Sequence, residues 1–497
     1  MRGGTQRRIQ YARPFSELLV SSWFLVPLAL LLGAFVASQF FSLTPRYLKL
    51  LAGALFFLAV VRLPMHRSLA IFCVIFCAPT FIFLTDTNVL FLGVILIYWA
   101  TQIGLGRAAR PVRTPIDWAI WSYLGIHALS FINVPTADGV LNGLRVMTFL
   151  VAGVIFYVLL VNGIRTEAHL ATVLRALAIT SSLVFLSGLV EWLGKGARLV
   201  PEWFLYRGGQ SPPTGGRIGG IFGFHGLLSD YSAVVFYLHV TQGMRARSGK
   251  LKLWYYSLAG LALLMIALTV NRGGAVIWAL GGLYFLLLRK GRVRWERLAL
   301  ALPLLVLVSV PLEVFTGKWF SKLALFARIA NTQFQRGVPD TRIEAWTAIL
   351  RRIPDHLWIG HGPYYDLHGG RGAVFWPHSA YLFYFYTTGF IGLVVFVWLI
   401  GKVIFLSRPQ GRVDFARGPF GQVAQAVLHI QVVMFAVAQL RDEHQRGNVY
   451  VYVMWMFFGL AVVATRLRRE EVRRLAQTGP SLAGNGPGGL EPEAASG

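Results

Sequence analysis

The sequence predicts an all-α, polytopic integral membrane protein with about 12–14 transmembrane helices and a long external helical loop. Hydrophobic residues make up 56% of the 497 residues and charged residues only 14%, whereas soluble domains contain about 25% charged residues. Apolar runs of about 20 residues, the length needed to cross a bilayer, recur along the chain. The basic residues of the short loops gather mainly on one side of these runs, as expected for cytoplasmic loops.

This composition excludes a soluble enzyme and a disordered chain. In a soluble protein, a net charge of +26, from 47 basic and 21 acidic residues, would indicate nucleic-acid binding. In a membrane protein the same excess follows from the gathering of Lys and Arg in cytoplasmic loops. We therefore expect membrane lipids around the chain and no nucleic acid as a partner.

Fourteen apolar segments are candidate transmembrane helices. They lie near residues 18–40, 47–62, 69–84, 88–104, 116–133, 141–162, 169–193, 226–243, 253–270, 273–288, 298–315, 379–401, 420–439 and 448–465. Two pairs of these segments form tight hairpins, so twelve spans are an alternative if both hairpins are re-entrant. With the N-terminus in the cytoplasm, most Lys and Arg of the short loops also fall inside. Both termini are then cytoplasmic, and the two long loops, 194–225 and 316–378, face outside.

The chain divides into a cytoplasmic N-terminus (1–17), a transmembrane domain (18–465) and a cytoplasmic tail (466–497) that we expect to be disordered. The end of the tail is rich in Gly, Pro, Ala and Ser and cannot bury a core. The sequence contains no P-loop, no GxGxxG on a soluble βαβ unit and no soluble domain large enough to bind ATP. We therefore expect no cofactor and no use of ATP.

The outer loop 316–378 contains a predicted helix, PDTRIEAWTAILRRIP, which the second proline ends. Thr341 opens it with a capping-box pattern. Arg342, Trp346 and Ile349 then share one face, because they are spaced by four and three residues. An Arg above Trp and Ile is unusual for a solvated helix. The alternative is an amphipathic helix on the bilayer surface, with Trp at the interface.

His378 lies directly before a long apolar segment, at the outer mouth of the membrane. A histidine there can act as a general base, since its pKa lies near neutral pH; the alternative is a hydrogen-bonded interfacial histidine. A zinc site formed with His361 and His368 is a third interpretation, but the spacing matches no common metal motif, so we expect no metal. The nearby Trp376 and Tyr381 either stack on sugar rings or belong to an aromatic belt.

Two further arginines lie at turns that face outside. Arg272, in TVNRGG, stands between two apolar segments, where it either snorkels or holds a phosphate with bidentate hydrogen bonds. Arg217 and His225 flank a glycine-rich stretch that either admits close backbone approach or is simply a flexible loop. Asp230, inside the following span, is expected to be a buried carboxylate, although its partner cannot be named from the sequence.

Together these segments resemble the O-antigen ligase and O-antigen polymerase superfamily. The resemblance covers roughly residues 210–400 and rests on RIGGIFGFHG, NRGG, TRIEAW, GHGPYY and PHSAYLFYFYTTGFIG, in this order. Two positions depart from the family pattern: FHG stands where an Asn-Pro-like turn is common, and Ser379 where Asn often follows the histidine. The resemblance implies a fold of the glycosyltransferase C type in the bacterial inner membrane.

The resemblance also implies an activity: inverting, metal-independent transfer of an undecaprenyl-diphosphate-linked glycan to a hydroxyl of lipid A-core or of another glycan. By the same resemblance His378 is the catalytic base on the periplasmic face, and Arg272, Arg342 and Arg217 bind the donor diphosphate. The residues expected to position the sugar or the acceptor are Trp346, Trp376 and Tyr381.

Other functions stay open at this point. A transporter or flippase of lipid-linked saccharides would explain the many spans and the arginines, but it requires charged residues at mid-membrane. Here the unusual residues crowd the outer mouth, which favours surface chemistry. A structural scaffold would tolerate substitution of the arginines and of His378. Within the enzyme class, the sequence does not separate a ligase, a polymerase and a protein O-oligosaccharyltransferase.

Overall fold

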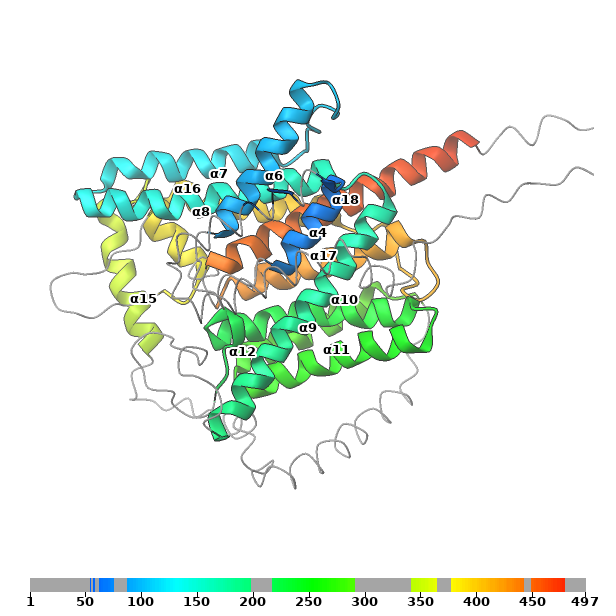
Figure 1. Cartoon of the computed structure of the whole chain (residues 1–497). Coiled ribbons are helices and arrows are strands. Elements are labelled where there is room, and N and C mark those ends of the chain that lie inside the picture. The colour runs from blue at the N-terminus through cyan, green and yellow to red at the C-terminus, as the bar shows by residue number, and fades with distance from the viewer. Residues whose placement is uncertain are drawn as a thin grey trace, which may run out of the picture.

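The computed structural model confirms the all-α polytopic fold class. It describes residues 54, 57–58, 62–75, 87–197, 217–290, 341–363, 377–441 and 448–478, and the structural statements below concern these ranges. Within them the chain forms helices and turns, with no strand and one isolated bridge between Arg289 and Val413. The helices pack side by side as one bundle (Figure 1).

The helices follow the predicted apolar segments. They are α4 (Met65–Ile75), α6 (Thr87–Gly104), α7 (Asp117–Leu129), α8 (Ala137–Gly163), α9 (Glu167–Ala197), α10 (His225–Arg245), α11 (Gly249–Leu268), α12 (Arg272–Leu288), α15 (Thr341–Arg352), α16 (Ala380–Ser407), α17 (Phe420–Ala438) and α18 (Asn448–Thr478). Short 3-10 helices are η1 (Ser130–Asn133), η2 (Gly220–Phe222) and η4 (Ile353–His356). The predicted spans at 18–40 and 298–315, and nearly all of 47–62, lie outside the described residues.

Six of the described helices are long and apolar enough to cross a membrane: α8, α9, α11, α16, α17 and α18. The helices α4, α6 and α12 are apolar but shorter. These three belong to the two tight hairpins, so the choice between twelve and fourteen spans stays a prediction.

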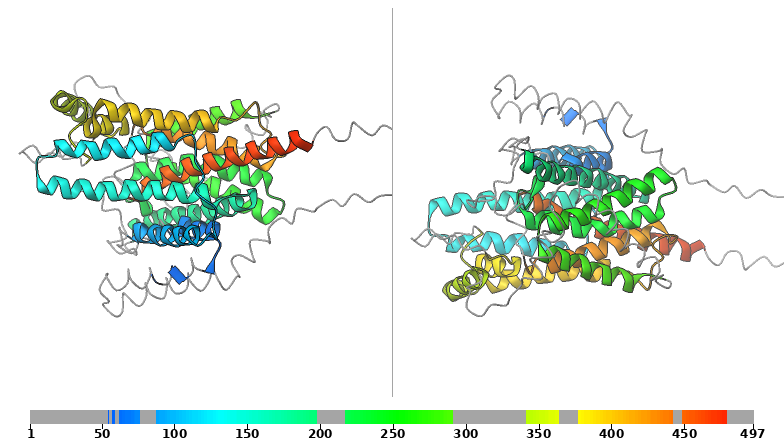
Figure 2. Two further views of the ribbon diagram at one scale, coloured as in Figure 1. Left: turned by 90° about the horizontal axis from the view of Figure 1, so that it is seen from above. Right: turned by 90° about the horizontal axis from the view of Figure 1, so that it is seen from below.

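Helix α18 forms the centre of the bundle. Of its most apolar stretch, 94% is buried inside the protein, and other helices surround it in both views of Figure 2. Trp455 is fully buried and lies against α8, where a side chain at Gly153 would collide with the indole ring. Small residues permit such close helix contacts in membranes, where packing rather than hydrophobicity drives helix association.

The expectation of a disordered tail from residue 466 onward is wrong for its first part, because α18 continues to Thr478. The extension is charged rather than apolar, and ion pairs of helical spacing support it. Arg468 lies 2.7 Å from Glu471, and Arg466 lies 3.8 Å from Glu470. Such pairs, together with good helix formers, sustain a helix beyond the apolar segment. Residues 479–497 lie outside the described part.

Helix α16 is broken at Gly389, whose backbone is non-helical (φ 70°, ψ −170°). The break would leave the carbonyls of residues 386 and 387 and the amides of residues 390 and 391 without their usual partners. The segment 357–362, which follows α15, supplies all four. His361 and Gly362 donate to Tyr386 and Thr387 at 2.9 and 3.0 Å. Phe390 and Ile391 donate to Leu357 and Trp358 at 2.8 and 3.3 Å.

The pairing of this loop with α16 requires two glycines that face each other. A Cβ atom at Gly389 would collide with the backbone of Trp358, and one at Gly360 with the backbone of Thr387. Both glycines also have positive φ angles, of 70° and 76°. The close backbone contact therefore fixes α15 and its following loop onto the start of α16.

We expect Gly389→Ala to lower stability by about 1–3 kcal/mol, because alanine is strained at this φ and ψ and collides with the inserted loop. Thermal unfolding in detergent measures the effect. Gly401→Ala is the matched control, since Gly401 lies on the same helix with open space around it. Equal unfolding temperatures for the two variants would contradict the proposed role of the contact.

Candidate active site

One end of the bundle, here called the site end, gathers most of the residues that the sequence singled out. Helices α9, α11 and α17 end there, and α10, α12 and α16 begin there. Helix α15 lies across these helix ends rather than along them (Figures 1 and 2). Residues far apart in the sequence are thereby brought to one surface.

Arg441, directly after α17, links two of these helix starts. Its Nη2 atom lies 2.5 Å from Oδ1 of Asp230 in α10, and its Nη1 donates to Oδ1 of Asn271 before α12. The Asp230 side chain is fully buried and that of Arg441 is 16% exposed. Asp230 thus has the partner that the sequence could not name, and the ion pair joins α10, α12 and α17.

The two glycines of Asn271-Arg272-Gly273-Gly274 make this arrangement fit. A Cβ atom at Gly273 would collide with the Arg441 side chain, and one at Gly274 with Ser229 of α10. Asn271 caps α12 by accepting a hydrogen bond from the Gly273 amide at 3.1 Å. Arg272, the first residue of α12, is partly buried at this junction. The Arg441 side chain, which is paired with a carboxylate, therefore packs against the glycine that directly follows Arg272.

Two residues at the site end have unusual backbone conformations. Among the described residues, Val270 and His378 are the non-glycine residues with positive φ, at 53° and 47°. Such values are uncommon, especially for a β-branched residue, and persist where the surrounding structure enforces them. Val270 precedes the Asn271-Arg272 turn, and His378 is the predicted base. Backbone strain thus occurs at two of the turns that carry candidate site residues.

The surroundings of His378 are tied to α15 and α17. The Trp346 indole N–H donates to the carbonyl of Pro377 at 2.5 Å. Ser379 caps α16, and the amide of Ala380 donates to the carbonyl of Gln439 at 2.8 Å. His378 is therefore held between the loop helix and the residues that lead to Arg441.

The predicted loop helix is confirmed as α15, which ends at Arg352 and continues as η4 around Pro354. Its buried face consists of Ala345, Ile349 and Ile353. The predicted face is therefore only partly right: Ile349 is buried, whereas Trp346 is 39% exposed and makes its contact through the indole N–H.

The remaining predicted site residues differ in how far the structure places them. Arg342 lies in the first turn of α15, but its side chain, like the whole of Trp376, lies outside the described residues. The Tyr381 hydroxyl donates to the carbonyl of Ala436 at 2.9 Å, which fastens α16 to α17. That bond favours a structural role for Tyr381 over direct stacking on sugars.

The glycine-rich stretch before α10 is ordered around a buried carboxylate. Oε2 of Glu191 accepts hydrogen bonds from the amides of Gly219 and Gly220 at 2.9 and 2.7 Å. Beside this turn, Nη1 of Arg217 lies 3.4 Å from Nε2 of His225. Arg217 therefore reaches the start of α10, at the site end, from a fixed turn.

His361 is structural. Its Nε2 donates to the carbonyl of Arg352 at 3.0 Å, and its ring stacks on Tyr386 with centroids 4.4 Å apart. Burial lowers the pKa of His361 below its ordinary value of 6.5, against the opposite effect of the hydrogen bond to Arg352. The neutral ring thus suits the folded loop. His368 lies outside the described residues.

The lowered pKa of His361 gives a pH prediction. Below pH 6.5 the unfolded protein binds a proton here more readily than the folded one, so stability should fall as the pH falls below that value. His361→Phe keeps the ring contact but cannot titrate. Between pH 7 and pH 5 it should lose less thermal stability than the wild-type protein. Parallel losses in both proteins would show that His361 does not contribute.

The site end can bind an anion and accept a proton. Arg272 is the first residue of α12, where the helix dipole also favours negative charge. Arg217 reaches the first residue of α10, His225, with its side chain, and α15 brings Arg342 to the same end. Sequence reasoning missed Arg441. An arginine in the short stretch after α17 is unremarkable, and its role follows only from the contact with Asp230 and Asn271.

Part of the chain matches a known protein family. Residues 257–397 match the family model described as O-Antigen ligase. The match runs from α11 into α16 and includes Arg272, Arg342 and His378. It confirms the resemblance to the O-antigen ligase and polymerase superfamily over this part of the chain, and it supports, broadly, a membrane glycosyltransferase of this type. No curated protein matches the chain.

Proposed function

We propose that this O-antigen ligase-like protein transfers a glycan from an undecaprenyl-diphosphate donor to an acceptor hydroxyl, with inversion and without a metal ion. The observation that supports the proposal most is the convergence of His378, two arginine-bearing helix starts and the turn of Arg217 at one end of the bundle. Positive groups there are suited to a diphosphate leaving group, and a histidine to a hydroxyl nucleophile. By its loop topology, we place this end on the periplasmic face of the bacterial inner membrane, with both termini cytoplasmic.

In the proposed reaction, the acceptor oxygen attacks the anomeric carbon from the side opposite the diphosphate. A new glycosidic C–O bond forms while the bond from the anomeric carbon to the phosphate oxygen breaks. His378 takes the proton of the acceptor hydroxyl, and undecaprenyl diphosphate leaves with the bonding electrons. Arg272 and Arg342 stabilise the negative charge that builds on the leaving group, with Arg217 as a further donor contact. The glycosyl-diphosphate bond supplies the energy.

Arg272 should be replaceable neither by alanine nor by lysine, because an ammonium group cannot reproduce the bidentate fork of a guanidinium. We expect Arg272→Lys to weaken donor binding by about tenfold or more, corresponding to about 1.4 kcal/mol. The measurement is the donor concentration dependence of glycan transfer with purified protein. Arg247→Lys, an exposed site at the other end of α10, is the control. Unchanged donor affinity in Arg272→Lys would contradict its role in donor binding.

The identity of the acceptor is tested by the surface-glycan profile of a deletion strain. The same strain is then complemented with the wild-type protein or with His378→Ala. Bare lipid core together with accumulated lipid-linked polymer would identify a ligase. A single repeat on the core would identify a polymerase. An unaltered lipopolysaccharide with unglycosylated proteins would identify a protein O-oligosaccharyltransferase. Full complementation by His378→Ala would favour the transporter or the scaffold instead.

A further inference from the structure

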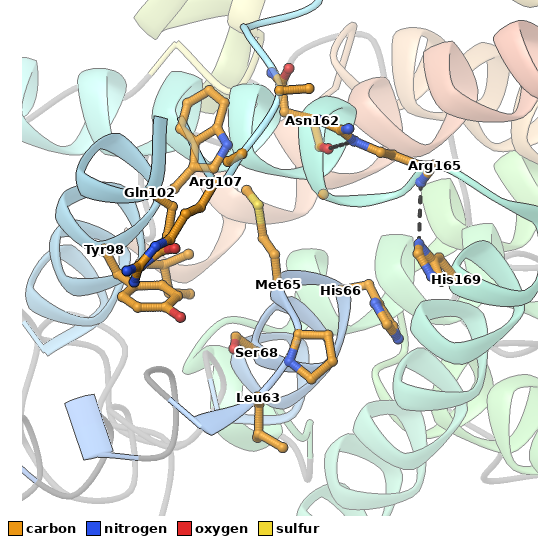
Figure 3. A pocket seen from close by; sticks show the side chains of 16 residues that line it. Leu63, Met65, His66, Ser68, Tyr98, Gln102, Arg107, Asn162, Arg165 and His169 are labelled. Atoms are coloured by element: carbon orange, nitrogen blue, oxygen red, sulfur yellow. Dashed lines mark hydrogen bonds between the residues drawn. The ribbon is translucent and has the colours of Figure 1, made fainter. Parts of the chain in front are cut away.

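A second polar site lies at the opposite end of the bundle. A pocket of about 320 Å³ opens between the start of α4, the end of α6, the end of α8 and the start of α9 (Figure 3). His169 of α9 lines the pocket, whereas Glu191 of the same helix belongs to the site end. At 1.5 Å per residue these two residues are about 33 Å apart along the helix, close to the thickness of a bilayer core. The pocket and the candidate active site therefore lie at opposite membrane faces.

The pocket carries positive charge. Arg107 and Arg165 line it together with His66 and His169, and none of the lining residues in the described part of the chain is acidic. Figure 3 shows the two arginines on opposite sides of the pocket, with Met65 between them. An anion between these walls would meet a guanidinium group from either side.

The polar wall is held in place by several contacts. Oδ1 of Asn162 accepts a hydrogen bond from the amide of Val112 at 2.7 Å, and its carbonyl accepts one from Nε of Arg165 at 3.1 Å. The amide of Arg165 donates to Nδ1 of His169 at 3.4 Å. The rings of His169 and His66 stack with centroids 3.8 Å apart and an angle of 8° between their planes. The loops after α6 and α8 are thus fixed to each other and to α4.

Ser68 gives an independent indication of a polar ligand. It lines the pocket, is 1% exposed, and its hydroxyl has no hydrogen-bond partner among the described residues. A buried hydroxyl in this state is costly and is normally satisfied by a ligand or water. The lining also includes the apolar side chains of Leu63, Ile95 and Trp99. The pocket therefore combines anion-binding groups with walls suited to hydrocarbon.

We propose that this pocket binds the phosphate group of an anionic phospholipid from the leaflet opposite the active site. A phosphate diester carries the charge that Arg107 and Arg165 would neutralise, and its oxygens can accept a hydrogen bond from the Ser68 hydroxyl. Basic pockets between transmembrane helices on the cytoplasmic side are suited to such head groups. A free phosphate ion shares the charge, but it leaves the apolar walls without an occupant.

The test is native mass spectrometry of the full-length protein in detergent, titrated with phosphatidylglycerol or with phosphatidylethanolamine. We expect wild type to retain phosphatidylglycerol preferentially. Each basic residue near an anionic lipid contributes about fivefold, so Arg107→Gln/Arg165→Gln should weaken retention roughly 30-fold. Arg110→Gln/Arg113→Gln is the matched control. It removes the same charge from exposed positions that do not line the pocket, in the loop that also carries Arg107.

Retention that falls only in the pocket variant supports the proposal, as does failure of inorganic phosphate and glycerophosphate to displace the lipid. Equal retention in both variants, or equal loss, would overturn it. Displacement of the lipid by inorganic phosphate at similar concentration would also overturn it, in favour of a free anion as ligand. Ser68→Leu fills the pocket without changing its charge, so it distinguishes binding in the pocket from electrostatic attraction to the surface. This variant should also retain less lipid. Unchanged lipid retention would contradict binding in the pocket.

Discussion

His378→Ala should slow glycan transfer by about 10²–10⁴-fold, the contribution of a positioned general base. Without the imidazole, the proton of the acceptor hydroxyl has no group to receive it as the new glycosidic bond forms. Donor binding should change little, because Arg272, Arg342 and Arg217 remain. Single-turnover transfer with a defined lipid-linked donor measures the chemical step directly and separates it from donor affinity.

The positive φ of His378 requires a second variant. Alanine is strained at a φ of 47°, so a slow His378→Ala enzyme could also reflect a displaced turn. Asparagine tolerates this backbone conformation but is not a base. His378→Asn should therefore keep the thermal stability of the wild type and still lose activity. Restored transfer with asparagine would show that His378 acts only through the shape of the turn.

Asp230→Ala should lower stability by about 3 kcal/mol, at the low end of the cost of breaking a buried ion pair. The low end applies because the Arg441 side chain, which is left without its carboxylate, is 16% exposed and so partly solvated. The loss should also reduce transfer, since Arg441 holds Asn271 at the start of α12. Thermal unfolding and transfer rate of the same preparations measure both effects.

A double-mutant cycle separates the ion pair from general packing. Asp230→Leu/Arg441→Met replaces both charges by apolar groups and should recover much of the stability that Asp230→Leu alone loses. Activity should not recover, because Met cannot donate to Asn271. Additive losses of stability in the double variant would show that the two residues are not coupled. Recovered transfer activity would show that Arg441 is not needed at the site.

The apolar segments predicted helices well, because the bilayer sets the length of a membrane span and an apolar run of that length is visible in the sequence. Contacts between spans were not predictable in the same way. Asp230 was recognised as a buried carboxylate, but its partner Arg441 lies more than 200 residues later, and hydropathy gives no pairing signal. The break at Gly389 was missed for a related reason. It lies within an uninterrupted apolar run, and its cause is a loop that packs from outside the helix.

The tail shows the opposite failure. The Gly-, Pro-, Ala- and Ser-rich end predicts disorder from residue 466 onward, whereas salt bridges of helical spacing continue α18 to Thr478. For the candidate site, the residues could be named from the family resemblance. Why particular residues stand next to them is clear only from the structure. Only glycine fits at the two positions after Arg272, because Arg441 and Ser229 occupy the space where a larger side chain would lie.

The broken helix α16 also bears on how the protein is made. A transmembrane helix normally completes its own backbone hydrogen bonds as it enters the bilayer, since unsatisfied groups there cost several kcal/mol each. Helix α16 cannot do so, because the groups that complete it belong to residues 357–362, which leave the ribosome earlier. Stable insertion of α16 therefore requires a loop that is already in place at the site end. Membrane integration of this helix and assembly of the candidate active site become one event.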